Sequence, residues 1–217
     1  MKKGALFDWD GVIIDSSAQH EESWAMLANE LGMPLPDDHF LRGFGMKNQV
    51  IIPEILQWTT DPDEIHRYSL RKEALYREIV REHGITPLPG VIELLQMLKK
   101  HGVSCAVASS THRENIETIF RLIGIRDYFQ AVVTAEDVSR GKPDPEVFLK
   151  GAEKIGCAPG NCVVFEDAHV GIEAGLAAGS RVIAVATTNA LVDLGKADLA
   201  VGSLEDVSWP VFSGMFR

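Results

Sequence analysis

The sequence is poor in cysteine, contains no long apolar run and has no excess of basic residues. Three cysteines occur among 217 residues, and no two of them form a CxxC pair. This argues against a disulfide framework and favours buried thiols in a reducing compartment. No segment approaches the ~18 apolar residues of a membrane span, and Asp8 interrupts the N-terminal apolar stretch too early for a signal peptide. We expect a cytoplasmic protein.

The charge balance restricts the partners. The chain has 21 Lys and Arg against 31 Asp and Glu, which gives a formal net charge of −10. Nucleic acids and anionic membranes both require a basic face, so neither is expected as a partner. With 46% hydrophobic and 24% charged residues, the chain can bury a core of ordinary size. We expect a monomer or a weak homo-oligomer that acts on a small molecule.

Most of the chain alternates between short apolar segments and helical periods that end at glycine. This pattern predicts an α/β fold, with a Rossmann-like parallel sheet covered by helices on both faces. Asp144 and Pro145 are expected to be the N-cap and the first residue of one helix. The expected strands are 4–7, 103–108, 131–134, 162–165 and 181–185, and the expected helices are 91–100, 113–123, 145–155 and 170–178.

A helical insertion is expected after the first strand, because residues 16–85 contain no convincing strand pattern. Ser16 and Gln19 match a capping box for a first helix that ends at Gly32. Asp61 precedes a proline and two acids, the pattern of an N-cap, and that second helix should run to about residue 83. Pro53 interrupts a weaker helical pattern between them. The sequence therefore predicts a catalytic core of residues 1–15 and 87–217, and a helical cap domain of residues 16–86.

Two aspartates follow the first strand at a spacing that places them together. On an extended chain, Asp8 and Asp10 point to one side and Trp9 to the other. The pair lies at the carboxyl end of a buried strand, where open α/β sheets bind ligands. The second such pair, Asp61 and Asp63, is explained by a helix N-terminus. Two neighbouring carboxylates need a cation or a retained proton, and either suits catalysis.

Other strands of the same sheet also end in polar residues. Ser109 and Ser110 follow the second strand, Lys142 follows the third, and Glu166 and Asp167 follow the fourth. Oxygen ligands without a His or Cys cluster favour Mg²⁺ over zinc. Hydroxyls, backbone amides and a lysine next to such a metal can hold phosphoryl oxygens, and a carboxylate can act as nucleophile in phosphoryl transfer. The sequence therefore predicts a magnesium-dependent site for a phosphorylated substrate.

Four ordered motifs resemble those of the haloacid dehalogenase superfamily, in its subgroup with a helical cap after the first strand. They are FDWDGVIIDS, AVASS, GKPDP and VVFEDAHVGIEAGLAAG, and they extend over most of the chain. The resemblance implies that Asp8 attacks phosphorus and forms an aspartyl-phosphate. Asp10 would protonate the leaving oxygen and then deprotonate water. Ser109, with Ser110 beside it, and Lys142 would hold the phosphoryl oxygens.

The resemblance also implies a ligand set for Mg²⁺. Asp8, Asp167, the backbone carbonyl of Asp10 and Glu166 would hold the ion. Ala168 departs from the family pattern, in which many relatives carry Ser after the acidic pair. The expected activity is hydrolysis of a small phosphorylated metabolite, such as a sugar phosphate.

The cap domain leaves a second activity open, that of a β-phosphoglucomutase-type phosphosugar mutase. His20 falls where the mutases carry a histidine on the first cap helix, and Arg42 lies near their Lys-Gly pair. The next cap arginine of the mutases falls on Met46, with Lys47 beside it. A mutase must bind a second phosphate group, so the absence of this arginine favours hydrolysis. His20, Arg42 and Lys47 are the candidate specificity residues.

Three other classes are disfavoured. Dehalogenases and phosphonate-cleaving relatives lack the second aspartate of the first motif, which is Asp10 here. Response-regulator receivers also combine acids, a hydroxyl and a lysine on an α/β fold. They are shorter and have no helical insertion of this size after the first strand.

Overall fold

The computed structural model describes residues 2–43 and 46–216, and they form two compact units. One unit, the core, comprises Met1–Asp15 and Thr86–Arg217, and the other, the cap, comprises Ser16–Ile85. The expected second boundary lay one residue later, after Thr86. Pro87 forms an isolated bridge with Ile14, and the amide of Leu88 donates to the carbonyl of Ile13 at 2.9 Å. These bonds join the returning chain to the loop that follows the first strand.

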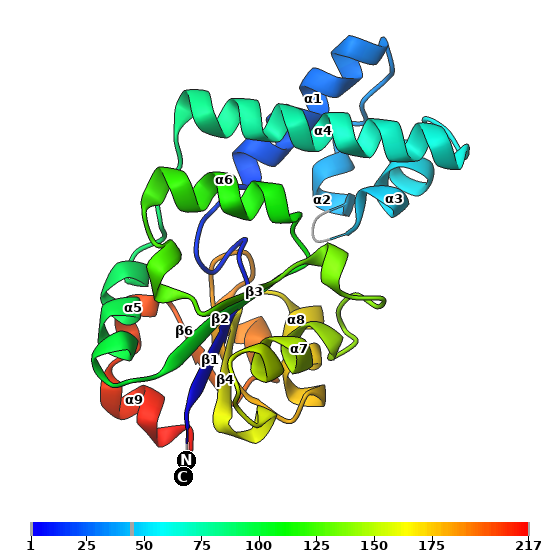
Figure 1. The fold of residues 1–217 in the computed structure, drawn as a ribbon. Helices are drawn as coiled ribbons and strands as arrows, with labels where there is room; N and C mark the ends of the chain where they lie inside the picture. Colours follow the sequence, from blue (N-terminus) through cyan, green and yellow to red (C-terminus); the bar gives the residue numbers. More distant parts are fainter. Residues whose placement is uncertain (1, 44–45, 217) are drawn as a thin grey trace. The chain divides into compact units, whose positions relative to one another are not determined.

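The core contains a six-stranded, fully parallel sheet (Figure 1). Its strand order is β3-β2-β1-β4-β5-β6, so β1 lies in the middle between β2 and β4. The expected α/β fold with a parallel sheet is confirmed, and the sixth strand is an addition to it. The strands are β1 (Gly4–Phe7), β2 (Ser104–Ala108), β3 (Ala131–Val133), β4 (Cys162–Glu166), β5 (Arg181–Val185) and β6 (Leu199–Val201).

Helices cover both faces of the sheet, α7 and α8 on one side and α5, α6 and α9 on the other (Figure 1). Because successive strand residues point to opposite faces, Leu6 joins the apolar cluster under α7 and α8. Phe7 stacks on Phe165 of the neighbouring strand at 4.6 Å on the other face. Both residues are fully buried, as expected for a parallel sheet. These helices are α5 (Val91–Lys100), α6 (Arg113–Ile123), α7 (Glu146–Lys154), α8 (His169–Ala177) and α9 (Trp209–Gly214).

Among the described residues of the cap, every regular element is a helix, and loops and turns join the helices. Asp61 caps the longest helix as expected, since its carboxylate accepts hydrogen bonds from the amides of Asp63 and Glu64 at 2.8 and 3.1 Å. The predicted capping box of Ser16 is wrong. Ser16 has ψ near 8° instead of the extended conformation of an N-cap, and its side chain makes no capping hydrogen bond. The cap elements are α1 (Ser17–Leu31), α2 (His39–Gly43), α3 (Asn48–Val50), a π-helical turn (Ile51–Ile55) and α4 (Pro62–His83).

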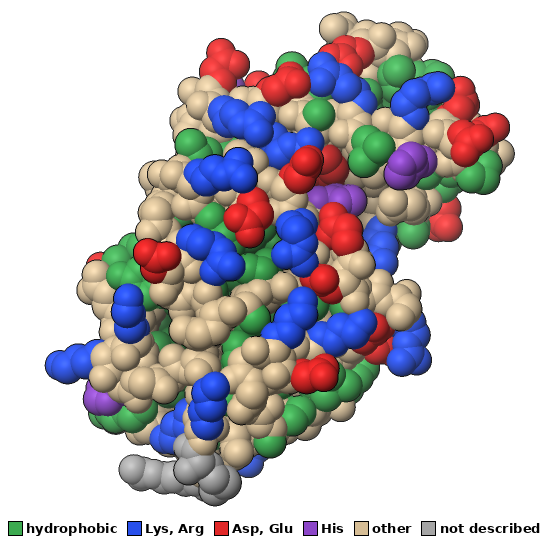
Figure 2. All heavy atoms as spheres, viewed as in Figure 1, with side chains coloured by type: hydrophobic (Ala, Val, Ile, Leu, Met, Phe, Trp, Pro, Cys, Tyr) green, Lys and Arg blue, Asp and Glu red, His purple; other side chains and the backbone are tan. Residues whose placement is uncertain are grey.

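The surface carries charges of both signs. On the face shown in Figure 2, Lys and Arg side chains alternate with Asp and Glu instead of gathering in one basic patch. Among the helices that the structure describes, none is long and apolar enough to cross a lipid bilayer.

Candidate active site

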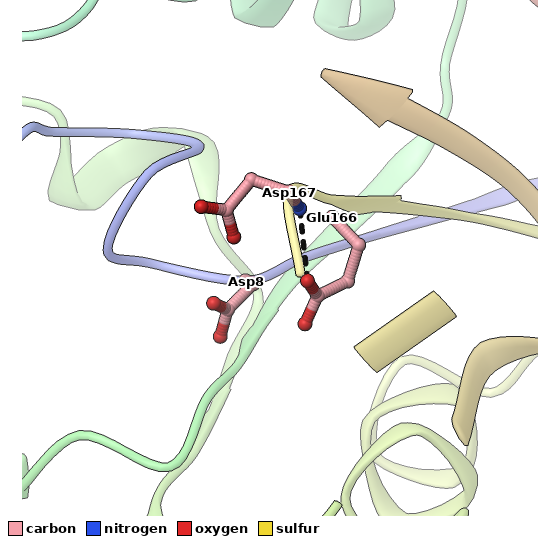
Figure 3. A group of neighbouring side chains, drawn as sticks. All are labelled: Asp8, Glu166 and Asp167. Carbon is pink, nitrogen blue, oxygen red and sulfur yellow. Dashed lines mark hydrogen bonds between the residues drawn. The ribbon is translucent and has the colours of Figure 1, made fainter. Parts of the chain in front are cut away.

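Three carboxylates meet at the carboxyl ends of β1 and β4. Phe7 and Phe165 are paired in the sheet, so the next residues, Asp8 and Glu166, lie side by side. The amide of Asp8 donates to the carbonyl of Phe165 at 3.0 Å, which extends the pairing by one step. Carboxylate oxygens of Asp8, Glu166 and Asp167 lie within 4.8 Å of one another, and all three residues are buried (Figure 3). The strand pairing therefore brings three acidic groups, and the negative charge that they carry, into one small space.

Lys142 neutralises part of this charge. Its ammonium lies 2.8 Å from Oδ1 of Asp8 and also contacts Oε1 of Glu166, and its side chain is only 8% exposed. Burial alone would lower the pKa of Lys142, but the charges and hydrogen bonds of Asp8 and Glu166 outweigh it and raise the pKa. The lysine is therefore charged and bridges two carboxylates from neighbouring strands.

The loop before α7 delivers Lys142, and it differs from the expected helix start. Asp144 and Pro145 were expected as N-cap and first residue, but the helix begins one residue later, at Glu146. Oδ1 of Asp144 accepts the amide hydrogen of Glu146 at 3.0 Å, so the acid still satisfies a free donor of the first turn.

Both carboxylate oxygens of Glu166 have protein partners. Oε1 faces Lys142, and Oε2 accepts the amides of Asp167 and Ala168 at 2.8 and 2.9 Å. The carboxylate also lies against Gly171 in the first turn of α8. Burial raises the pKa of Glu166, and the charge of Asp8 adds to this, whereas Lys142 opposes it. Glu166 is thus held in one orientation, with its acid group directed at the lysine.

Gly171→Ala is expected to lower both activity and stability. A Cβ at this position would lie 1.8 Å from Oε1 of Glu166, closer than any real contact. Alanine is favoured over glycine in helices by ~1 kcal/mol, but overpacking of this kind costs ~1–3 kcal/mol. Displacing the Glu166–Lys142 pair should reduce kcat by ~10-fold or more. Urea unfolding and steady-state kinetics measure the two effects.

Gly195→Ala is the matched control, because no atom lies within 4 Å of its Cβ position. A Gly171→Ala variant as stable and active as the control would contradict the tight packing of Glu166.

Asp167 has a separate set of partners. The hydroxyl of Thr188 donates to its Oδ2, and Nδ2 of Asn189 donates to its backbone carbonyl at 2.9 Å. Gly11, at φ 77°, passes so close that a Cβ there would lie 2.0 Å from Oδ2 of Asp167. The sequence reasoning missed Thr188 and Asn189, although both follow β5, and the rule that polar residues gather at strand ends could have found them.

Burial raises the pKa of Asp167 to about 8, and the charges of Glu166 and Asp8 contribute. The ordinary value is 3.8, so the unfolded chain loses this proton at lower pH than the folded protein does. The group's contribution to the unfolding free energy must therefore fall as the pH rises from about 4 to 8, by no more than ~1.4 kcal/mol per pH unit.

We expect Asp167→Asn to gain stability relative to the wild type across this pH range when no metal is present. Denaturant titrations in chelator at several pH values measure the difference between the two proteins. The exposed Asp193→Asn is the matched control and should follow the wild type at every pH. A difference between Asp167→Asn and the wild type that is constant with pH would show that Asp167 is ionised throughout.

The side chain of Asp10 reaches the loop that follows β2. Its Oδ2 accepts a hydrogen bond from the hydroxyl of Thr111. Trp9 points to the other side, where it is fully buried against Phe120 at 5.0 Å, as the strand alternation predicts. Asp8 contacts Lys142 and Asp10 contacts Thr111, so the two acids of the first motif have different partners in the structure.

The loop after β2 separates the two predicted serines. Ser109 is 2% exposed, and its amide donates to the carbonyl of Val133 at 3.0 Å, which keeps it at the sheet edge. Its Oγ lies 3.3 Å from the hydroxyl of Thr111. Ser110 is exposed. Ser109 is thus a buried hydroxyl of the site, and Thr111 is a site residue that the sequence predictions did not include.

The donor set suits a hard divalent cation. Among the described residues, Asp8, Glu166 and Asp167 form the one group of acidic, His or Cys side chains that could hold an ion. Carboxylate oxygens without nitrogen or sulfur are the ligands of Mg²⁺ and Ca²⁺. Burial and the neighbouring acids raise the pKa values of Glu166 and Asp167, and a bound cation would favour their ionised forms.

Residues 5–185 match the model of the haloacid dehalogenase-like hydrolases. The chain belongs to this family. Hydrolases of the family generally use a divalent metal, which agrees with the acidic group at the end of β1 and β4.

Known relatives match the chain over nearly all of its length. It is 36% identical to the chloroplastic 5-amino-6-(5-phospho-D-ribitylamino)uracil phosphatase of Arabidopsis thaliana over 94% of this chain, although the match spans only 55% of that protein. It is 35% identical to hexitol phosphatase A of Escherichia coli K12, over 95% of this chain and 93% of that one. The crystal structure of β-phosphoglucomutase from Clostridium difficile has a TM-score of 0.86 at 26% identity, and covers 100% of this chain and 97% of its own.

In this hydrolase, the three predicted cap residues have different environments. The ring of His20 stacks on Tyr76 at 4.0 Å, and its Nδ1 lies 2.6 Å from the ammonium of Lys72. Arg42 is 46% exposed and pairs with Asp38 at 3.5 Å, and Lys47 is also exposed. His20 alone of the three belongs to a buried polar group of the cap.

That buried group continues through α4. Lys72, 3% exposed, lies 3.1 Å from Oε1 of Glu73, and Nδ2 of Asn48 donates to the same oxygen at 2.7 Å. Asn48 also contacts the hydroxyl of Ser69 at 3.1 Å. The sequence reasoning missed these residues. Lys72 lies four positions before the buried Tyr76 on α4, and a charged residue on the apolar face of a helix is a signal that could have revealed it.

Proposed function

We propose that this chain is a magnesium-dependent phosphatase that hydrolyses a small phosphorylated metabolite, such as a sugar phosphate, through an aspartyl-phosphate on Asp8. The observation that carries the proposal is the buried Asp8 carboxylate, held by Lys142 beside Glu166 and Asp167 at the carboxyl edge of the sheet. Similarity to phosphatases of phosphorylated sugars and sugar-like compounds supports the substrate class. The three buried free thiols, Cys105, Cys157 and Cys162, suit a cytoplasmic location.

The first chemical step transfers the phosphoryl group to Asp8. A carboxylate oxygen of Asp8 forms a bond to phosphorus while the bond from phosphorus to the leaving oxygen breaks. Asp10 gives its proton to the leaving oxygen, which departs as an alcohol. Lys142 and Ser109 hold the phosphoryl oxygens. Lys142 is buried beside Asp8, and Ser109 is buried at the end of β2.

The second step returns the enzyme to its starting state. Asp10, now a carboxylate, takes a proton from a water molecule as the water oxygen attacks phosphorus. The bond from phosphorus to Asp8 breaks and inorganic phosphate is released. Asp8 and Asp167, with Glu166 and the Asp10 carbonyl, would hold Mg²⁺, which supplies positive charge to the phosphoryl oxygens when bound.

A screen of phosphorylated metabolites tests the proposal. Purified protein is assayed for phosphate release with Mg²⁺ present, after chelation and after Mg²⁺ is restored. We expect release from one or more sugar or polyol phosphates that disappears on chelation and returns with Mg²⁺. No release from any compound in the set would contradict the proposed function.

The mutase alternative has its own diagnostic, because the fold is also that of β-phosphoglucomutase. Incubation with β-glucose 1-phosphate is followed for glucose 6-phosphate and for free phosphate. Isomer formation without phosphate release would replace hydrolysis by phosphoryl transfer between sugar positions.

A further inference from the structure

Thr111 connects two groups of the site that come from different strands. Its hydroxyl donates to Oδ2 of Asp10, which follows β1, and its backbone amide donates to Oγ of Ser109, which follows β2, at 3.2 Å. Its carbonyl accepts the amide of Ala135, which follows β3, at 3.3 Å. The residue is therefore anchored through its backbone on two sides, and its hydroxyl is directed at Asp10.

We propose that Thr111 is a positioning residue that holds the carboxyl group of Asp10 where it exchanges protons with the leaving oxygen and with water. This inference rests on the proposed function, because it assigns Asp10 the acid–base role. The backbone amide of Thr111 donates to Oγ of Ser109, and its hydroxyl donates to Asp10 and also lies 3.3 Å from Oγ of Ser109. Removing the hydroxyl keeps the amide bond that orients Ser109, so the larger loss falls on Asp10.

The backbone around Asp10 is already fixed, so its side chain is the part that needs support. The amide of Gly11 donates to the carbonyl of Ile14 at 2.7 Å, and that of Ile13 donates to the carbonyl of Trp9 at 2.8 Å. The Asp10 side chain is half-buried and retains two rotatable bonds. The Thr111 hydroxyl donates to Oδ2 and so restrains the rotation of the Asp10 carboxyl group.

The size of the effect follows from the role. General acid–base catalysis raises the rate by ~10²–10⁴-fold. Without the hydrogen bond from Thr111, Asp10 should lose a part of this factor. We expect Thr111→Val to lower the turnover number by ~10–100-fold with KM within about threefold of wild type, because the Ser109 and Lys142 contacts to the phosphoryl group remain.

p-Nitrophenyl phosphate separates the two chemical steps. Its leaving phenolate needs little protonation, so formation of the aspartyl-phosphate depends weakly on Asp10, whereas hydrolysis of the intermediate still needs Asp10 as base. Rapid-mixing measurements with Mg²⁺ should show, for Thr111→Val, a burst of nitrophenolate at a rate within threefold of wild type. The slow steady state that follows should be at least ~10-fold below wild type. Asp10→Asn should show the same pattern more strongly.

Thr111→Ser is the matched control, because it keeps the hydroxyl, and it should restore turnover to within about threefold of wild type. Thr111→Ala is a second test of hydroxyl removal if the valine variant fails to fold, and circular dichroism establishes the fold of each protein. Steady-state turnover of a folded hydroxyl-free variant within threefold of wild type would overturn the inference, as would equal loss in the burst and steady-state rates.

Failure of the proposed function gives a different result. Wild-type protein would then release neither nitrophenolate nor phosphate from the metabolite set, and the inference would fall with it. An active wild type with unimpaired Thr111→Val contradicts only the role of Thr111.

Discussion

Replacing Asp8 with Asn is expected to abolish turnover of phosphorylated substrates. The amide has nearly the shape of the carboxylate, but it is neutral and its oxygen is a far weaker nucleophile. Removal of a nucleophile from other hydrolases costs up to ~10⁶-fold, and we expect a loss of at least ~10⁴-fold here. Lys142 would still contact Glu166, so the variant should fold. Phosphate release and intact-mass measurement of acid-quenched protein test the two aspects, since only wild type should carry a phosphoryl group.

Asp61→Asn offers a matched control for this substitution. Asp61 also begins an Asp-x-Asp pair, but it caps α4 and lies in the cap unit. Asparagine is as good an N-cap as aspartate, so this variant should keep wild-type stability and activity. Wild-type activity in Asp8→Asn would show that the reaction does not pass through this carboxylate.

The central part of the fold could be predicted from local pattern. The strands 4–7 and 181–185 and the helix 113–123 agree residue for residue with β1, β5 and α6, because buried apolar runs and glycine stops define their ends. The strand β6 was missed because it has three residues and is only partly buried. The helix α9 was missed as well, since six residues are too few to display a helical period.

The site was predictable where residues directly follow a strand. Asp8, Glu166 and Asp167 each continue a buried apolar run, so sheet pairing alone brings them together. Lys142 and Thr188 lie some residues beyond the ends of β3 and β5 and reach the acids through loops, so the strand-end rule places them near the acids without fixing their contacts. Lys142 was predicted because it follows the third expected strand and also lies in the third motif, whereas Thr188 belongs to none of the recognised motifs.

Lys142→Met is expected to be the most destabilising single change in the site. Methionine keeps the length of the chain but leaves Asp8 and Glu166 as buried charges without their cation. Removing one partner of a buried ion pair costs ~3–5 kcal/mol, which is a large part of the unfolding free energy of a small domain. Turnover should also fall strongly, because the ammonium that faces the phosphoryl oxygens is lost. Urea titrations at neutral pH in chelator measure the unfolding free energy without assistance from a metal.

Lys150→Met is the control for the loss of a lysine that is not buried. Lys150 is 38% exposed and pairs with Glu146 at 2.6 Å on the surface of α7, so the solvent screens its charge. It should change stability far less than Lys142→Met. Equal effects of the two substitutions would show that Lys142 acts as an ordinary surface charge.

A second substitution distinguishes the structural role of Lys142 from its chemical role. In Lys142→Met/Glu166→Gln, one of the two unpaired buried charges is removed, so part of the lost stability should return. Lowering the pH should restore stability to the single variant in the same way, because protonation neutralises Glu166, whose pKa is raised by burial. Turnover should not recover in the double variant, since no cation from the chain faces the phosphoryl group. Recovery of turnover together with stability would mean that Lys142 serves the fold alone, and that positive charge at this edge of the sheet comes entirely from the bound metal.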